Sequence, residues 1–202
     1  MTSKEELLEA LRTLTKQQGN RVVDLLSSAP ASLKSDRDVV LEAVGKNGCA
    51  LEHAEKVLKS DLEVAFTAVD KTKSAVRYVD RAVALQIASM LPGVLESAGG
   101  LQADKDFVCA AVRCDVESLQ FASQELRNDR DVVRAAVEGH FTALRYAGAD
   151  LTSDVGFLTE AVSINPLALC FATETMKADK SFILPLVSQD GGTLEFVAEE
   201  LK

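Results

Sequence analysis

The sequence predicts an all-α protein, an α-solenoid of about seven to eight two-helix units, and three observations support this prediction. One pattern of residues recurs at a spacing of 25, which is typical of repeat architectures. The chain holds only 4 Pro in 202 residues, so long disordered or low-complexity stretches are not expected. Aromatic residues make up 5% of the chain and Trp is absent, so Ala, Val and Leu must form most of the core. Such small side chains favour closely packed helices.

An apolar residue, usually Leu, marks the boundary of each repeat. Neighbouring boundary residues lie 25 apart, except for one gap of 43 between Leu58 and Leu101. We interpret this gap as one normal repeat and one shortened repeat of 18 residues, with Val83 at the boundary position. The boundary residues are Leu33, Leu58, Leu101, Leu126, Leu151, Met176 and Leu201.

Further columns keep this register through six copies. An Asp follows each boundary by three residues, an Ala-Val pair or a close equivalent by 10 and 11, and a small residue followed by an apolar one by 17 and 18. An aromatic-type position comes two residues later, and Ala or Val follows it at once. The Asp column is Asp36, Asp61, Asp104, Asp129, Asp154 and Asp179, and the aromatic-type column is His53, Tyr78, Phe121, Tyr146, Phe171 and Phe196.

Each Asp is expected to begin the first of two helices in its repeat. Asp is a preferred N-cap because its carboxylate accepts hydrogen bonds from free amides of the first turn, and its charge complements the helix dipole. After Asp129, the residues Val132, Val133, Ala136 and Val137 form one apolar face at helical spacing. The repeat predicts such a helix after every Asp of the column.

Asn, Gly and Pro residues then predict a turn, for example at 46–48 and 165–166. A second helix of about two to three turns should follow, carrying Ala143, Leu144, Ala147 and, near its end, Leu151. Helices this short are marginal alone in water, so each repeat must be stabilised by stacking against the next.

The pattern predicts a single α-helical repeat domain over 1–202. Residues 1–32 form an N-terminal cap unit with helices near 4–16 and 21–28, and residues 33–82 form two repeats. Residues 83–100 form an irregular short unit, in which Gln86 occupies the Asp position and Pro and Gly interrupt the helices. Residues 101–202 form four repeats. We interpret the short unit as an interruption that divides the chain into sub-arrays at 1–82 and 101–202.

Charge and hydropathy exclude some classes of partner. The net charge of −9 and the pI of about 4.8 disfavour a polyanion, and no dense Lys/Arg run is present, so no nucleic-acid partner is expected. No apolar run approaches the roughly 20 residues that span a bilayer, so no membrane insertion is expected. The polar, acidic N-terminus resembles neither a signal peptide nor a transit peptide, which predicts a cytoplasmic or other reducing intracellular location.

The four cysteines, Cys49, Cys109, Cys114 and Cys170, form no CxxC pair and lie far from His53 and His140 in sequence. Zinc ligands are typically grouped on short turns, so these residues are expected to be buried free thiols. No metal and no cofactor are predicted.

Two columns offer alternative interpretations. The Asp column is interpreted as helix caps rather than as a carboxylate ladder for cations, because calcium loops place acids at alternate positions around a central Gly. The aromatic column is interpreted as core packing rather than as a ligand-stacking ladder, since it lies between apolar positions. His53 belongs to this column and is expected to pack there, whereas His140 is expected in a solvent-facing turn.

The sequence holds no GxSxG element, no phosphate-binding Gly loop and no recognisable nucleophile and base pair, so no enzyme and no catalytic residue are predicted. The repeat architecture favours a non-enzymatic protein-protein interaction module with an unidentified protein partner. The alternative is a structural or accessory subunit of a larger multiprotein complex. The candidate binding face is formed by variable positions beside the aromatic column: Glu52, Arg77, Gln120, Arg145, Cys170 and Glu195.

The residues at 126–133, 136–137 and 143–147 resemble the tandem repeats of the domain of unknown function 4116 family. Residues 33–54 and 101–122 match this pattern equally well. The resemblance covers most of 33–201, is weakest at 83–100, and departs from the pattern at Leu186, where Ala is usual. It implies the repeat type, and it implies no activity and no catalytic residues.

Overall fold

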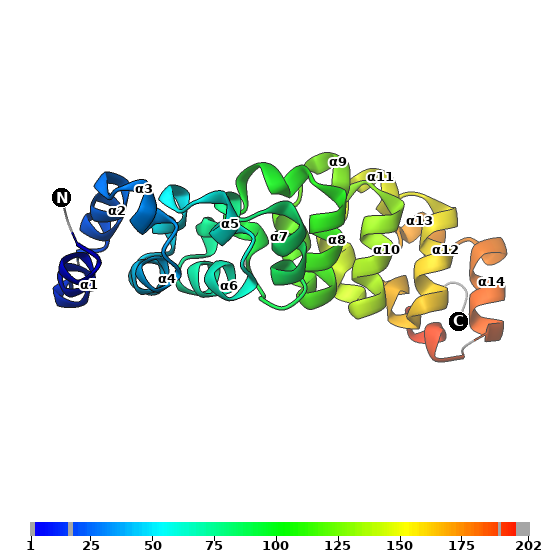
Figure 1. Cartoon of the computed structure of the whole chain (residues 1–202). Coiled ribbons are helices and arrows are strands. Elements are labelled where there is room, and N and C mark those ends of the chain that lie inside the picture. Colours follow the sequence, from blue (N-terminus) through cyan, green and yellow to red (C-terminus); the bar gives the residue numbers. More distant parts are fainter. Residues whose placement is uncertain (1–2, 16–17, 190, 197–202) are drawn as a thin grey trace. The chain divides into compact units, whose positions relative to one another are not determined.

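The computed structural model describes residues 3–15, 18–189 and 191–196, and the described part is helical throughout with no β-strand (Figure 1). The prediction of an all-α tandem repeat is therefore confirmed. The chain divides into two compact units, an N-terminal unit, Met1–Leu101, and a C-terminal unit, Gln102–Lys202. The predicted single domain over 1–202 stays a prediction.

A regular repeat contains three helical segments. A four-residue α-helix holds the boundary residue, an α-helix of ten residues follows the Asp, and a 3-10 helix of six residues ends the repeat. In the N-terminal unit these are α3 (Ala31–Lys34), α4 (Arg37–Lys46) and η2 (Gly48–His53), then α5 (Lys56–Lys59), α6 (Leu62–Lys71) and η3 (Lys73–Tyr78).

The C-terminal unit repeats the same order. Its segments are α8 (Lys105–Cys114), η6 (Val116–Phe121), α9 (Gln124–Arg127), α10 (Arg130–Gly139), η7 (Phe141–Tyr146), α11 (Ala149–Thr152), α12 (Val155–Ile164), η8 (Pro166–Phe171), α13 (Glu174–Lys177), α14 (Lys180–Gln189) and η9 (Gly191–Phe196).

The ten-residue helices begin where the Asp column predicts. In α4, Oδ1 of Asp36 accepts hydrogen bonds from the amides of Asp38 (3.1 Å) and Val39 (3.2 Å). Asp61 and Asp129 accept the equivalent two amides, and Asp104 and Asp154 accept the amide three residues on. The carboxylate of Asp179 accepts from the amide of Ser181. The prediction that the Asp column caps helices is confirmed.

The predicted second helix is wrong in type and extent. Segment η7 ends at Tyr146, Ala147 is extended (φ −65°, ψ 153°), and Leu151 lies in the separate helix α11. The amide of Gly148 donates to the carbonyl of Arg127 in the preceding repeat (2.8 Å), so a contact between repeats holds the chain extended at this point. Segment η7 has six residues and buries only Ala143 and Leu144. Such a pattern fits a 3-10 helix and an α-helix equally well, so periodicity could not distinguish the two helix types.

Stacking within each unit makes two rows. Each long helix buries an apolar face, which in α4 is Val39, Val40, Ala43 and Val44. The 3-10 helices η2, η3, η6, η7 and η8 each bury a small residue and the apolar residue after it. In the N-terminal unit α4 lies beside α6 and η2 beside η3. In the C-terminal unit the long helices α8, α10, α12 and α14 follow one another, as do η6, η7, η8 and η9 (Figure 1). One row of each unit is thus α-helical and the other is 3-10 helical.

The N-terminal segment extends both rows. Helix α1 (Lys4–Thr13) lies beside α4, and α2 (Gly19–Ser28) lies beside η2. Ser3 caps α1 in a capping box with Glu6, which takes the place of the Asp cap. The helices predicted at 4–16 and 21–28 are both present, although Lys16 lies outside the described residues.

The short unit is organised differently from the prediction. Asp80, rather than Gln86, caps helix α7 (Arg81–Ala88), and Oδ1 of Asp80 accepts from the amide of Ala82. From this cap the normal pattern continues, with Val94 and Leu95 buried as the central pair near η4 (Leu95–Ser97). The spacing from Asp61 to Asp80 is 19 residues rather than 25, because no four-residue helix separates η3 from α7. The boundary between the two compact units falls within η5 (Gly99–Ala103).

Candidate functional site

The predicted binding positions all lie on the 3-10 rows. Glu52, Arg77, Gln120, Arg145 and Glu195 each occupy the residue before the last of a 3-10 helix, and each is exposed. Cys170 holds the same position in η8 and is half-buried. The structure brings Glu52 and Arg77 onto neighbouring helices of the N-terminal unit, and the others onto consecutive helices of the C-terminal unit.

The aromatic-type column is half-buried rather than fully buried. His53, Tyr78, Phe121, Tyr146 and Phe171 are all of intermediate exposure, and the side chain of Phe196 lies outside the described residues. The aliphatic residues around them, such as Leu144 before Tyr146, are buried. The prediction of core packing therefore holds for only part of each ring, and the rest of the ring adds apolar area beside the exposed positions.

Two further rings join this surface in the C-terminal unit. Phe141, the first residue of η7, lies 6.3 Å from Phe171 of η8 between ring centroids, in a tilted arrangement. His140 stacks on Phe141 at 4.7 Å and is exposed in the turn between α10 and η7, as predicted. Phe141 was not predicted from the sequence, because the first position of the 3-10 helix has no constant residue type.

The polar groups of the N-terminal row are bonded within the chain. Arg77 Nη2 donates to the carbonyl of Ser97 at 3.2 Å. A hydrogen bond with Glu52 and partial burial raise the pKa of the Tyr78 hydroxyl above its usual value. These interactions orient the side chains of Glu52, Arg77 and Tyr78.

Along the row of long helices the structure reveals a charge ladder that the sequence analysis missed. The basic residue directly after one cap reaches the Asp cap of the next repeat in the same unit. Lys4 Nζ lies 2.8 Å from Asp36 Oδ2, Arg37 Nε lies 3.0 Å from Asp61 Oδ2, and Arg130 Nη1 lies 3.3 Å from Asp154 Oδ2. Lys105 pairs in the same way with Asp129.

A second acid in each repeat completes most steps of the ladder. Lys4 also contacts Asp38, Arg37 contacts Glu63, and Lys105 contacts Asp131. Arg130 instead reaches Glu160, which Arg134 also contacts at 3.6 Å. In most of these repeats the sequence has a basic residue after the Asp and an acid one position later. Only the stacked structure shows that the basic residue of one repeat pairs with the acids of the next.

The ladder changes the titration of its members. A hydrogen bond from Lys4 lowers the pKa of Asp36 below its usual value, and the backbone amide of Val64 together with Arg37 lowers the pKa of Asp61. Partial burial opposes ionisation of Asp129, but hydrogen bonds from Lys105 and from the Val132 amide outweigh it and lower the pKa. The carboxylates thus have cations and amides as partners already, which leaves them poorly suited to bind an external cation.

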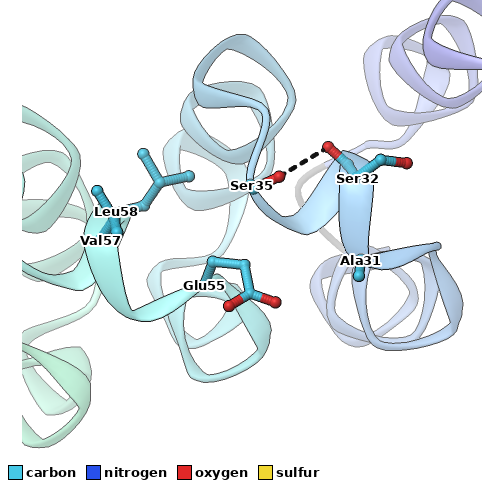
Figure 2. Close-up of a pocket in the computed structure, with 6 residues that line it drawn as sticks. All are labelled: Ala31, Ser32, Ser35, Glu55, Val57 and Leu58. Atoms are coloured by element: carbon cyan, nitrogen blue, oxygen red, sulfur yellow. Dashed lines mark hydrogen bonds between the residues drawn. The ribbon is translucent and has the colours of Figure 1, made fainter.

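Shallow grooves lie between the four-residue helices. One groove, of about 470 Å³, lies between α3 and α5 and is lined by Ala31, Ser32, Ser35, Glu55, Val57 and Leu58 (Figure 2). Val57 is 80% exposed beside it. The equivalent groove between α9 and α11 is smaller, about 270 Å³, and more polar, with Gln124, Arg127, Asn128 and Asp150 along it. Neither groove holds a set of converging ionisable groups.

The comparison with known protein families agrees with this repeat geometry. The family model for a domain of unknown function, DUF4116, matches the chain four times in tandem, at residues 14–58, 36–82, 104–152 and 154–202. The chain belongs to the DUF4116 family. The matches leave out 83–103, which holds most of α7 and the irregular segments η4 and η5. No curated protein and no solved structure matches the chain.

DUF4116 membership establishes the repeat type and assigns no activity. In the described part of this DUF4116 chain, no cluster of three or more His, Cys, Asp or Glu residues is placed to hold a metal ion. All four cysteines are free and half-buried, and burial raises the pKa of the Cys109, Cys114 and Cys170 thiols. None of the described helices has the length and apolar character needed to cross a membrane.

Proposed function

We propose that the chain is a non-enzymatic protein-protein interaction module whose binding surface is the row of 3-10 helices. The observation that carries the proposal is the contrast between the two rows. On the long-helix row, Lys4, Arg37, Lys105 and Arg130, each directly after a helix cap, are paired with acids of the next repeat. On the 3-10 row, equivalent exposed positions differ from repeat to repeat and lie beside half-buried rings. Variable side chains on a constant scaffold are what repeat proteins use for recognition.

Aromatic residues and Arg are the side chains most enriched at binding hot spots. The C-terminal unit presents both, with Phe121, Tyr146 and Phe171 at one position of consecutive 3-10 helices and Arg145 among them. We favour a protein over a nucleic acid as partner because the net charge is −9.

Photo-crosslinking tests the proposal. A photoreactive amino acid is introduced at Gln120 or Arg145 on the 3-10 row, and at Arg113 or Glu138 on the long-helix row as matched exposed controls. We expect crosslinks to a partner protein in native extract from the first pair and not from the second. Equal crosslinking from both rows, or none from either, would contradict the proposal.

A structural or accessory subunit of a larger complex is the second candidate. Several large apolar side chains outside the 3-10 rows are exposed, including Leu184 at 61% and Val155 at 51%. Apolar surface of this kind is covered in obligate assemblies. A stoichiometric complex that survives purification, combined with low stability of the isolated chain, would favour this candidate.

We also propose a cytoplasmic or other reducing intracellular location, supported by the four free cysteines. Thiol labelling of the protein in intact cells tests it: all four thiols should be reduced, and an oxidised pair would contradict the proposal.

A further inference from the structure

The 3-10 helices of the C-terminal unit carry one basic side chain, and it lacks an ionic partner in the part of the chain that the structure describes. Arg145 is the only Lys or Arg in segments η6, η7, η8 and η9. It is exposed, and no carboxylate of the described residues lies within 4.0 Å of it. The ladder cations Lys105, Arg130 and Arg134 of the same unit are paired with acids. Arg145 is therefore available to an external anion.

Half-buried aromatic rings accompany Arg145 on this row. Tyr146 follows it in the chain, and Phe121 and Phe171 hold the same position in the neighbouring helices η6 and η8, all half-buried. Leu167 of η8 is 43% exposed, and Phe141 lies near Phe171. When a ligand covers these rings, water is excluded from a charge pair between Arg145 and the ligand. The lower local dielectric strengthens that pair.

The equivalent position of the N-terminal unit is occupied differently. Arg77 donates to the carbonyl of Ser97, and the neighbouring Tyr78 hydroxyl interacts with Glu52. One guanidinium donor of Arg77 is thus used within the chain. Among the described residues no such bond occupies the guanidinium of Arg145.

We propose that the 3-10 row of the C-terminal unit binds a peptide segment of a partner protein that carries a carboxylate next to apolar side chains. The inference rests on the proposed function and specifies its partner. Arg145 pairs with the carboxylate, because a guanidinium matches a carboxylate in a two-point hydrogen-bonded geometry. The rings of Phe121, Tyr146 and Phe171 contact the apolar side chains. A lysine-rich segment is disfavoured by repulsion from Arg145.

Fluorescence anisotropy with synthetic peptide pools tests this proposal on the full chain. One labelled pool has Glu fixed at its centre and Leu or Phe at the flanking positions, and matched pools have Gln or Lys at the centre. We expect the Glu pool to bind at least about tenfold more tightly than the Gln pool, the difference that a well-placed charge-assisted hydrogen bond supplies. The Lys pool should bind most weakly.

Substitutions at Arg145 test whether this residue causes the preference for the Glu pool. Arg145→Gln should remove the preference for Glu over Gln, Arg145→Lys should retain part of it, and Arg145→Glu should shift the preference to the Lys pool. Arg113→Gln, an exposed arginine on α8 with the same charge change, is the control and should bind like the unsubstituted chain. Circular dichroism and thermal melting of each variant verify the fold.

Equal binding of the Glu and Gln pools, or equal effects of Arg145→Gln and Arg113→Gln, overturns the inference. If crosslinks from Gln120 and Arg145 still identify a partner in extract, the proposed function stands and only the acidic peptide is wrong. Self-association that Arg145→Gln abolishes identifies a second copy as the occupant and also overturns the inference.

Discussion

The carboxylate of Asp129 divides its two oxygens between its own helix and Lys105 of the preceding repeat. Oδ1 accepts the amides of Asp131 at 3.0 Å and Val132 at 3.2 Å, and Oδ2 lies 2.8 Å from Lys105 Nζ. Asp36, Asp61 and Asp154 divide their oxygens in the same way. One side chain per repeat thus begins a helix and fixes its register against the helix before it.

Substitutions at Asp129 separate the two roles. Asp129→Ala removes the cap and the ion pair, and should lower the free energy of unfolding by about 1–2 kcal/mol. Asp129→Asn keeps a capping oxygen and should cause a smaller loss, because exposed ion pairs contribute little. Urea unfolding followed by circular dichroism measures both. Asp131→Asn, which removes ion-pair contacts with Lys105 and Arg134 and leaves the cap in place, should resemble Asp129→Asn. Equal losses for Ala and Asn would show that capping is not the main role.

Acid should destabilise the protein through the same carboxylates. The folded-state pKa values of Asp36, Asp61 and Asp129 lie below the ordinary value of 3.8, so the unfolded chain binds more protons at low pH. Their contribution is complete above that value and is lost as the pH falls below it.

Unfolding measured over this acid range should show stability rising with pH, with a smaller slope in Asp129→Asn. The raised pKa of Lys105 acts on the alkaline side, where its contribution is lost only above the ordinary 10.5. An unchanged acid slope in Asp129→Asn would contradict the assignment.

Gly148 leaves room for the side chain of Asn128 in the preceding repeat. A Cβ at position 148 would lie 1.6 Å from Asn128 Oδ1, so the two residues cannot both be accommodated in the observed arrangement after Gly148→Ala. We expect this substitution to cost about 1–3 kcal/mol, as overpacking does. Equivalent positions elsewhere pair a shorter Ser35 with Glu55.

The double variant Asn128→Ser, Gly148→Ala should therefore recover most of the loss, since the serine side chain is shorter. A double-mutant cycle by thermal melting measures the coupling between the two positions. Additive losses would show that the contact is not responsible.

Gly45 and Gly48 provide a matched pair for close packing between repeats. A Cβ at Gly48 would lie 2.0 Å from the carbonyl oxygen of Ala68 in α6, whereas nothing lies within 4 Å of a Cβ at Gly45. Gly48→Ala should destabilise by about 1–3 kcal/mol, because backbone cannot move aside easily. Gly45→Ala, at an exposed position in the last turn of α4, should stabilise by about 0.5 kcal/mol, the lower end of the range for a helix interior. Chemical unfolding compares the two, and equal effects would contradict the close approach of η2 and α6.

The local features of each repeat could be predicted from the sequence alone. The Asp caps, the buried apolar face of the long helices and the 25-residue period depend on side chains within a few residues of one another, so the pattern predicted them correctly. Glu52, Arg77, Gln120, Arg145 and Glu195 are exposed, and the binding face that they were expected to form stays a prediction.

The other features of the fold depend on contacts between repeats, which exist only in the tertiary structure. The break after η7 depends on the hydrogen bond from Gly148 to Arg127, so a local pattern extended the helix too far. Asp80 replaced Gln86 as the cap because the four-residue helix before α7 is missing, which the fixed period did not anticipate. The ladder from Lys105 to Asp129 and the half-exposed rings around Arg145 exist only once neighbouring helices are stacked, since their partners are distant in sequence.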